Sequence, residues 1–429
     1  MKNFNIIMKW AKDLFPICRS ITGKGTLKTL SYLKNINPEL KINSVASGRK
    51  FFDWKVPNEW NVSDAYILHL KSGKKFANFK KNNLYLVNYS HKINKLFNLN
   101  ELKKKIHTDI KNPKNIPYIT SYYKKDWGFC LSYNEFSKLP TGDYRVVIDS
   151  KLSPGRLHYG ELLVKGISKK EILISTNICH PSLANNELSG PLLASYLIQS
   201  IKKNFTNNYY SYRFLFIPET IGSIIYIKKN LDHLKKNVIA GFVLSCVGDN
   251  RAYSIINSRR ANTLSDLSLS TSLMNLKNVK EYSYLFRGSD ERQYCSPGVD
   301  LPIVGFCRSK YGEYPEYHSS ADNLSIISAK GFEGSYNVLF DIFSSFEIGL
   351  KPKTIIKCEP QLSKRGLYPT LSDKKNYSNM QVNLRMNLIS YCDGDLNIFE
   401  ISKIIGAPLK NIIEELKILK KNRIVKMYR

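Results

Sequence analysis

Four short, almost fully apolar runs occupy the middle of the chain. They are EILIST (171–176), YRFLFI (212–217), AGFVLS (240–245) and LPIVGF (301–306). Stretches with helical spacing of apolar residues, such as PLLASYLIQSIKK, lie between them. Buried strands that alternate with helices are typical of a mostly parallel sheet covered on both faces. The sequence therefore predicts an α/β domain in this region.

Two other patterns precede these runs. Residues 1–63 begin with two amphipathic helices and continue into an extended segment. Residues 64–150 hold short alternating runs, such as NLYLVNY and YRVVIDS, split by polar turns. Alternation with period two indicates antiparallel strands. We therefore expect residues 1–63 and 151–352 to form one α/β domain that carries a small inserted β domain at 64–150.

The C-terminal part has a third pattern. A polar stretch at 364–379, KRGLYPTLSDKKNYSN, is typical of a linker. Beyond it, Asn397 is placed to cap a helix that Gly406 ends, Pro408 opens a second helix, and RIVKMY reads as a strand. Helix, turn, helix and strand predict a truncated winged helix over residues 384–429.

Composition narrows the setting of the protein. An apolar fraction of 43% in 429 residues is that of a globular chain with a sizeable core. No apolar run reaches the roughly 20 residues that span a bilayer, and no signal peptide is evident. Eight scattered cysteines without a C-x-x-C pair suggest reduced thiols. We expect a cytoplasmic protein with no membrane partner.

The formal charge of +30 is compatible with an anionic partner such as nucleic acid. The lysines, however, are spread evenly along the chain beside many Asn and Ile residues. This even spread favours compositional bias over a dedicated binding segment.

Polar side chains gather just beyond the ends of the apolar runs. His180 and Glu187 follow the first run, Glu219 the second, Asp249 the third and His318 the fourth. In open α/β sheets, ligands bind beyond the carboxyl ends of the strands. Neutral imidazoles and carboxylates are good ligands for a zinc-type ion. The sequence therefore predicts a metal site at this edge of the sheet.

Each of these residues also has a structural explanation. A single histidine in a loop is usually only hydrogen-bonded, Glu219 is placed to cap a helix that starts at Thr220, and Asp249 is best explained as a turn residue. Joint placement of two histidines and Glu219 at strand ends is what favours the metal site.

A dense polar loop, FRGSDERQYCSPGVD, covers residues 286–300. Asp290, Glu291 and Arg292 in this loop are placed to bind substrate or to orient a ligand histidine. A surface ion cluster explains the same residues equally well.

Five motifs carry a resemblance to a known family. HPSLANNELSG, PETIG, VGD, RGSDERQY and YHSSADNL, in this order, resemble a bacterial family of aminopeptidase-like proteins often found near polysaccharide-biosynthesis functions. RSITGKG, FDWKVPNEW, HTDIKNP and SYYKKDWGFCL match it too, so the resemblance covers nearly the whole chain. It implies a zinc-aminopeptidase-like core, an inserted β domain and a C-terminal winged helix.

The wider zinc-exopeptidase clan, which includes leucyl aminopeptidases and glutaminyl cyclases, implies roles for single residues. His180 matches its first histidine ligand, and His318 in a Tyr-His-Thr-like motif matches its last. Asn186 stands where the clan has an aspartate that bridges two metals, and Glu187 lies beside it. From the same comparison and the polar loop, we assign Asp290, Arg292 and Tyr317 to substrate binding.

Two further departures from the clan limit the number of metals. A single Glu219 replaces a Glu-Glu pair that supplies a base and a ligand, and Ser245 replaces the third acidic ligand. A two-metal site needs more carboxylates than remain. One zinc ion is therefore expected, with protein ligands from the set His180, Asn186 or Glu187, Glu219 and His318. If Glu219 is a ligand, Glu291 is the candidate general base.

The sequence thus predicts a zinc-dependent hydrolase that acts on an amide or peptide-type bond of a small-molecule or peptide-like substrate, with a link to surface polysaccharide biosynthesis. The alternative is a diverged, non-enzymatic or regulatory protein of the same fold. DNA binding by the winged helix is the third hypothesis. Its second helix has no arginine and carries Glu414 and Glu415, which oppose phosphate, so packing within the molecule or in a homo-oligomer is favoured.

Overall fold

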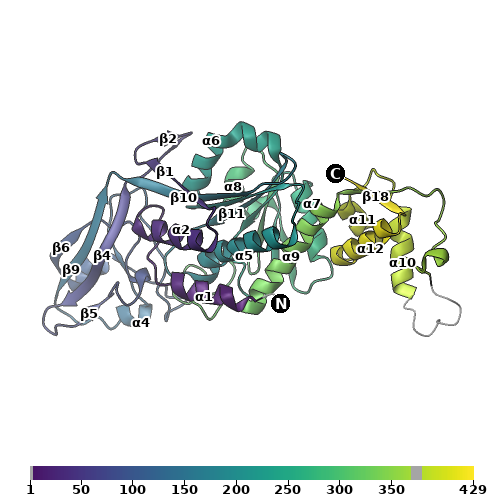
Figure 1. Ribbon diagram of the computed structural model, residues 1–429. Helices are drawn as coiled ribbons and strands as arrows, with labels where there is room; N and C mark the ends of the chain where they lie inside the picture. The colour runs from purple at the N-terminus through teal and green to yellow at the C-terminus, as the bar shows by residue number, and fades with distance from the viewer. Residues whose placement is uncertain (1–2, 369–378) are drawn as a thin grey trace.

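The computed structural model describes residues 3–368 and 379–429. Part of the expected linker at 364–379 therefore lies outside the described residues. From left to right, Figure 1 shows a β extension, a central α/β layer and a small helical unit. No helix in the described part of the chain combines the length and the hydrophobicity that crossing a bilayer requires.

The central sheet has eight strands in the order β1-β10-β12-β11-β13-β16-β14-β15. Their bounds are β1 (Lys41–Ala46), β10 (Arg156–Val164), β12 (Ser211–Ile217), β11 (Glu171–Asn177), β13 (Val238–Leu244), β16 (Ile303–Cys307), β14 (Tyr253–Ile256) and β15 (Val279–Tyr282). The four apolar runs are β11, β12, β13 and β16, which pair in parallel. Their carboxyl ends therefore meet at one edge, and the expected mostly parallel sheet is confirmed.

Helices cover both faces of this sheet (Figure 1). They are α1 (Asn5–Leu14), α2 (Lys24–Ile36), α5 (Ser189–Asn204), α7 (Leu264–Leu273) and α9 (Ala329–Ile348) on one face, and α6 (Ile221–Asn237) and α8 (Glu291–Tyr294) on the other. Ile172 and Ile174 of β11 pack into the core beneath α5, whereas Leu173 packs into the core beneath α6. Burial on both faces is why the strand sequences are continuously apolar.

The inserted segment forms an antiparallel sheet in the order β5-β4-β9-β6. These strands are β4 (Glu59–His69), β5 (Lys75–Phe76), β6 (Ile93–Asn98) and β9 (Asp143–Ser153). Short elements complete this part of the chain: β2 (Lys50–Phe51), β3 (Trp54–Lys55), η1 (Asn83–Tyr85), α3 (Leu99–Lys103), β7 (Ile106–His107), β8 (Phe129–Cys130) and α4 (Tyr133–Phe136). Alternate residues of β9, namely Tyr144, Val146 and Ile148, are buried, as the period-two pattern predicts.

The C-terminal unit contains α10 (Asn379–Ser390), α11 (Ile398–Ile405) and α12 (Leu409–Lys421). Asn397 caps α11 and Gly406 ends it in the left-handed conformation, as the sequence predicts. Strand β18 (Val425–Tyr428) pairs with β17 (Lys351–Thr354). Of the two acids on α12, Glu414 is exposed but Glu415 is buried, so only Glu414 opposes a phosphate at the surface.

Candidate metal centre

His180 and His318 lie side by side although they come from distant parts of the chain. His180 follows β11, and His318 lies in the loop between β16 and α9. Their ring centroids are 5.5 Å apart. Because β11, β13 and β16 run parallel, the loops after them reach the same edge of the sheet. The convergence of the two imidazoles expected from the sequence is therefore present.

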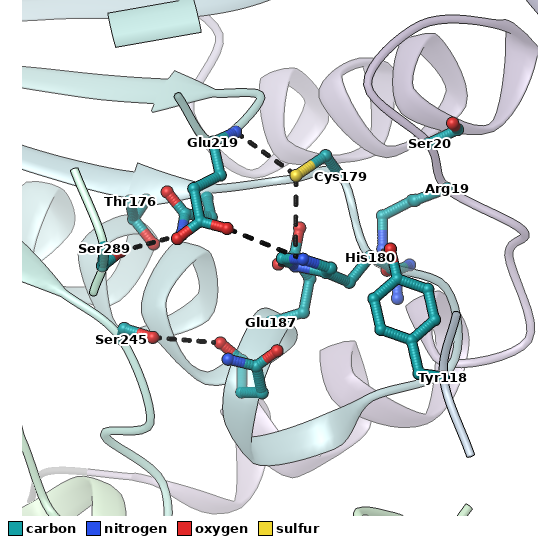
Figure 2. Close-up of polar contacts among 12 residues, drawn as sticks. Arg19, Ser20, Tyr118, Thr176, Cys179, His180, Glu187, Glu219, Ser245 and Ser289 are labelled. Carbon is teal, nitrogen blue, oxygen red and sulfur yellow. Dashed lines mark hydrogen bonds and ion pairs between the residues drawn. The ribbon is translucent and has the colours of Figure 1, made fainter. Parts of the chain in front are cut away.

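Glu219 joins them from the end of β12. Its Oε2 lies 3.7 Å from His180 Nε2, and Ser289 donates a hydrogen bond to the same carboxylate (Figure 2). Burial raises the pKa of Glu219, although His180 and Arg292 partly oppose the shift. A carboxylate with a raised pKa is suited to accept a proton near neutral pH.

Glu187 contacts the opposite nitrogen of the same imidazole. Its Oε2 accepts from His180 Nδ1, while Glu219 faces Nε2. The π-helix η2 (Ala184–Leu188) places the Glu187 carboxylate beside Nδ1 of the ring. A carboxylate on the second ring nitrogen fixes the orientation and tautomer of a metal-binding histidine. Glu187, expected from the sequence as one of two alternative ligands, is thus placed to orient His180.

Asn186 occupies the position where the clan has its bridging aspartate. Its Oδ1 is buried and has no hydrogen-bond partner among the described residues. The backbone N–H donates to Asp322 Oδ2 at 3.0 Å, and the backbone carbonyl accepts from Ser245 Oγ at 3.3 Å. Ser245 therefore supports the backbone of Asn186, and the side-chain amide oxygen of Asn186 stays available as an uncharged ligand for a metal ion.

A buried cation lies behind this cluster. Arg19 is fully buried and donates through Nε to the His180 carbonyl at 2.9 Å. Burial lowers the pKa of Arg19, and the nearby Glu187 carboxylate opposes that shift. Arg19 thus balances the charge of Glu187 in a water-poor environment. Arg19 belongs to the RSITGKG motif, but no pattern in the sequence indicates a role for this residue.

Tyr118 is a second residue that sequence analysis missed. Its ring lies edge-on to both imidazoles, with centroid distances of 5.1 Å to His180 and 5.2 Å to His318. Its backbone N–H donates to the His318 carbonyl at 2.8 Å. No periodicity marks the surrounding stretch IPYIT, so nothing in the pattern could have pointed to it.

Tyr317 stacks on the His318 ring with a centroid distance of 3.9 Å. It is not among the residues that line the cavity beside the two histidines. The sequence assigned it to substrate binding, and the structure places its ring against that of His318. His318 itself has a φ of 52°, an unusual conformation for a residue with a side chain, and its loop needs such support.

Asp290 directly precedes α8, and its fully buried carboxylate lies against the N-terminus of α6. Its Oδ1 accepts from the Thr220 N–H at 2.7 Å and from Ser223 Oγ at 2.8 Å. Burial, followed by repulsion from Glu219, raises the pKa of Asp290 to about 7. The carboxylate therefore satisfies the N-terminus of α6 and does not line the cavity.

Glu291 is also fully buried. Its Oε1 accepts from the Gly288 N–H at 2.8 Å, the Ser289 N–H at 3.0 Å and the Tyr311 hydroxyl at 2.5 Å. These three donors hold the 286–300 loop in place. Glu291, the candidate base in the sequence, does not line the cavity that contains His180.

The cavity itself has a volume of about 570 Å³. Its lining combines the site with aromatic and apolar walls: Ile21, Trp54, Tyr118, Ile119, Thr120, Tyr122, Tyr123, Cys179, His180, Glu219, Thr220, Ile221, Arg292, Gln293 and His318. Glu219 is the only carboxylate among these described lining residues. Arg292 donates to Thr220 Oγ1 at 2.5 Å, and its Nε is buried without a partner. Of the loop residues assigned to substrate binding, only Arg292 reaches the cavity.

Asp249 lies outside this group. Its carboxylate accepts from Asn185 Nδ2 at 2.9 Å and from the backbone N–H of Ser309 at 2.9 Å. The carboxylate also accepts from the backbone N–H of Arg251, two residues further on, at 2.9 Å, which is a local bond typical of a turn residue.

The side chains at this edge of the sheet include the donor types that bind a metal ion. His180 Nε2 and Glu219 Oε2 face each other, the ring of His318 is adjacent, and Asn186 Oδ1 is a buried acceptor without a partner. Nitrogen and oxygen donors of this kind suit zinc. Cys179 also lies within 4.8 Å of donor atoms of His180 and Glu187, but burial raises the pKa of its thiol to about 12.

The parallel sheet with this site at its carboxyl edge has the zinc-aminopeptidase fold. A zinc aminopeptidase from Bacillus subtilis matches with a TM-score of 0.55 at 12% identity, over 78% of this chain and 92% of that one. An aminopeptidase from Aneurinibacillus matches with a TM-score of 0.51 at 13% identity, over 79% and 94%. At such low identity these likenesses show the fold alone.

The family is shown by closer matches. The model of a domain of unknown function (DUF4910) matches residues 8–349, and a winged helix-turn-helix model matches residues 351–427. The chain belongs to the DUF4910 family. A Clostridium acetobutylicum protein, provisionally named a polysaccharide biosynthesis protein with an aminopeptidase-like domain, is 43% identical over 372 residues, 85% of this chain and 83% of its own.

A solved structure supports the same assignment. The crystal structure of a Clostridium acetobutylicum protein, provisionally described as a peptidase, matches with a TM-score of 0.90 and 38% identity. The match covers 99% of this chain and 96% of that one. These relatives confirm the aminopeptidase-like domain expected from the sequence, and the family model over residues 351–427 confirms the C-terminal winged helix.

Proposed function

We propose that this protein is a zinc-dependent hydrolase that cleaves an amide or peptide-type bond. One observation carries the proposal: His180, Glu219 and His318 come from three separate strand ends and meet in one cavity. The aminopeptidase-like fold and the relatives' names support the same reaction class.

Two imidazoles and an amide oxygen would hold the ion in this proposal. They belong to His180, His318 and Asn186, and Glu219 completes the set if it also binds. A bound zinc ion would polarise the carbonyl of the scissile bond and lower the pKa of a water molecule. Asn186 and Ser245 replace two acidic ligands of the clan, which supports one ion rather than two.

Glu219 is assigned to proton transfer. It is the only carboxylate that lines the cavity among the described residues, and burial raises its pKa. One of its oxygens faces His180, and the carboxylate also accepts from Ser289, so its position is fixed. Glu187, Tyr118 and Tyr317 act through the histidines as positioning residues.

The biological setting is proposed from the name of the Clostridium acetobutylicum relative, which joins polysaccharide biosynthesis to an aminopeptidase-like domain. A substrate from surface polysaccharide synthesis, with an amide-linked group, satisfies both parts of that name. The loss of acidic ligands at Asn186 and Ser245 favours one alternative, a diverged protein that keeps the fold and regulates another. Turnover of an aminoacylated or N-acylated amino sugar, lost in Glu219→Gln, would exclude that alternative.

Metal analysis of protein purified without chelator tests the proposal. We expect about one equivalent of zinc in the wild type and less than a tenth in His318→Ala. His158→Ala is the matched control, because His158 lies on β10 and is not a lining residue of the cavity. Zinc below a tenth of an equivalent in the wild type, or full zinc in His318→Ala, would refute the proposal.

Glu219→Gln separates the two roles of that residue. A glutamine keeps the shape of the side chain but cannot accept the proton. We expect zinc content to stay above half of the wild-type value while hydrolysis is lost. Loss of zinc in the same variant would reassign Glu219 from base to ligand.

A further inference from the structure

A second groove adjoins the cavity of the metal centre. Its volume is about 1070 Å³, and Tyr122 and Tyr123 line both spaces. Five lysines line the groove: Lys55, Lys92, Lys124, Lys125 and Lys151. We call this feature the lysine groove. The two tyrosines therefore form a shared wall between the lysine groove and the cavity that contains Glu219.

The charge of the lysine groove is not balanced locally. No aspartate or glutamate is present among the described residues that line it. Lys92 lies 3.7 Å from Asp149, whereas the other four lysines have no carboxylate within 4.0 Å in the described part of the chain. A concave surface of one sign focuses the electrostatic potential and attracts ligands of the opposite sign.

The fold, and not the sequence, gathers these lysines. They come from β3, from the segment before β6, from the loop before β8 and from β9. Along the sequence, lysine is spread evenly, and this favoured compositional bias as the cause of the high charge. Within the groove, however, five lysines gather beside the cavity of the candidate metal centre.

Aromatic side chains stand where the groove meets the cavity. Trp54 is 36% exposed and Tyr123 is 55% exposed, and their ring centroids lie 5.6 Å apart. The Tyr122 hydroxyl bonds to the Tyr118 hydroxyl at 2.8 Å, which connects the groove wall to the residue beside both histidines. Exposed aromatic rings offer flat apolar faces to a ligand ring.

Resting on the proposed function, we propose that the substrate is an anionic saccharide whose acidic groups lie along the lysine groove while its amide reaches Glu219. Flexible lysines accommodate irregularly placed anionic groups, and Trp54 and Tyr123 present faces for sugar rings. A groove that reads nucleic-acid bases would favour arginine, whose planar guanidinium forms two parallel hydrogen bonds with a base edge. No arginine is present among the described lining residues of the groove.

Binding of labelled oligosaccharides to the full chain, followed by fluorescence anisotropy, tests this inference. The anionic probes are an oligogalacturonate, which bears carboxylates, and a phosphorylated mannan fragment, which bears phosphates. A neutral maltooligosaccharide of the same length is the reference. We expect at least one anionic probe to bind about tenfold more tightly than the neutral one, and its affinity to fall as salt is raised.

A double variant locates the binding. Lys124→Gln/Lys125→Gln should weaken the anionic probe about tenfold. Lys420→Gln/Lys421→Gln removes the same charge from exposed positions on α12 and should leave binding unchanged. Equal affinity for all three saccharides, no effect of the groove variant, or tighter binding of a single-stranded oligonucleotide at the same salt would each overturn the inference.

One variant keeps this test separate from the proposed reaction. His318→Ala removes a metal ligand but leaves the lysine groove intact. We expect it to bind the anionic probe as the wild type does. Saccharide binding that is lost in His318→Ala would place the probe at the metal centre and overturn the assignment to the groove.

Discussion

The backbone N–H of Tyr118 donates a hydrogen bond of 2.8 Å to the carbonyl of His318. This bond joins the segment inserted into the aminopeptidase-like core to the loop that carries the second imidazole. Two further contacts join the same two segments. They are a β-bridge between Pro117 and Ser319 and a hydrogen bond of 2.9 Å from the Ser320 N–H to the Ile116 carbonyl. The inserted β domain therefore forms one wall of the candidate site.

Tyr118→Ala should lower zinc affinity about tenfold or more, because both imidazoles lose the ring that packs against their edges. Tyr118→Phe should bind zinc as the wild type does. It loses only the hydroxyl, which bonds to Tyr122 and not to a histidine, and it keeps the ring contacts with both imidazoles. Competition with a chromogenic chelator measures the affinity, and thermal unfolding checks that both variants are folded. Equal zinc affinity in the alanine variant would show that Tyr118 does not position the histidines.

Glu187→Ala should weaken zinc binding by about 10- to 100-fold, because His180 Nδ1 loses the carboxylate that fixes the ring. Glu187→Gln keeps an acceptor oxygen for Nδ1 and should lose less. The same chelator competition ranks the three proteins. If both variants bind zinc as tightly as the wild type, Glu187 has no role in orienting His180.

Much of the candidate site could be predicted from the sequence, because it depends on sheet topology. The apolar runs identified β11, β12, β13 and β16, and parallel pairing then brings His180, Glu219 and His318 to one edge. Each of these residues follows the end of a strand directly or after one loop. Knowing the strands and their parallel pairing was therefore enough to predict that the residues meet.

Side-chain direction could not be predicted in the same way. Glu291 follows Asp290 in a polar loop, and the sequence cannot tell that backbone N–H groups at Gly288 and Ser289 turn its carboxylate away from the cavity. The role of Glu187 depends on a π-helical turn that no periodicity signals. Tyr118 and the lysine groove depend on packing between distant segments, which leaves no local pattern.

Asp322→Ala should destabilise the protein by about 2–4 kcal/mol, because two buried backbone N–H groups lose their acceptor. Asp322 Oδ1 accepts from Asn185 at 2.7 Å, and Oδ2 accepts from Asn186 at 3.0 Å. Asp322→Asn keeps one carbonyl oxygen and should cost less. Urea unfolding monitored by circular dichroism measures the difference. An unchanged midpoint in the alanine variant would mean that η2 does not need this carboxylate.

Glu415→Ala should destabilise the winged helix by about 3–5 kcal/mol, because it leaves a buried guanidinium without its partner. Arg385 Nε and Glu415 Oε2 lie 2.9 Å apart between α10 and α12, with side chains only 5% and 3% exposed. The ion pair of Glu415 with Arg385 thus holds α12 against α10.

Two comparisons make the test of this ion pair specific. Glu414→Ala changes the exposed neighbour and should alter stability by less than about 0.5 kcal/mol. Arg385→Met/Glu415→Leu replaces the pair by apolar groups and should recover most of the loss. Hydrogen exchange of α10 and α12 reports the local stability of this unit. Because the apolar pair leaves the surface charge of α12 unchanged, it should also leave any binding to DNA unchanged. If the double variant is as unstable as Glu415→Ala, packing rather than the unpaired charge accounts for the loss.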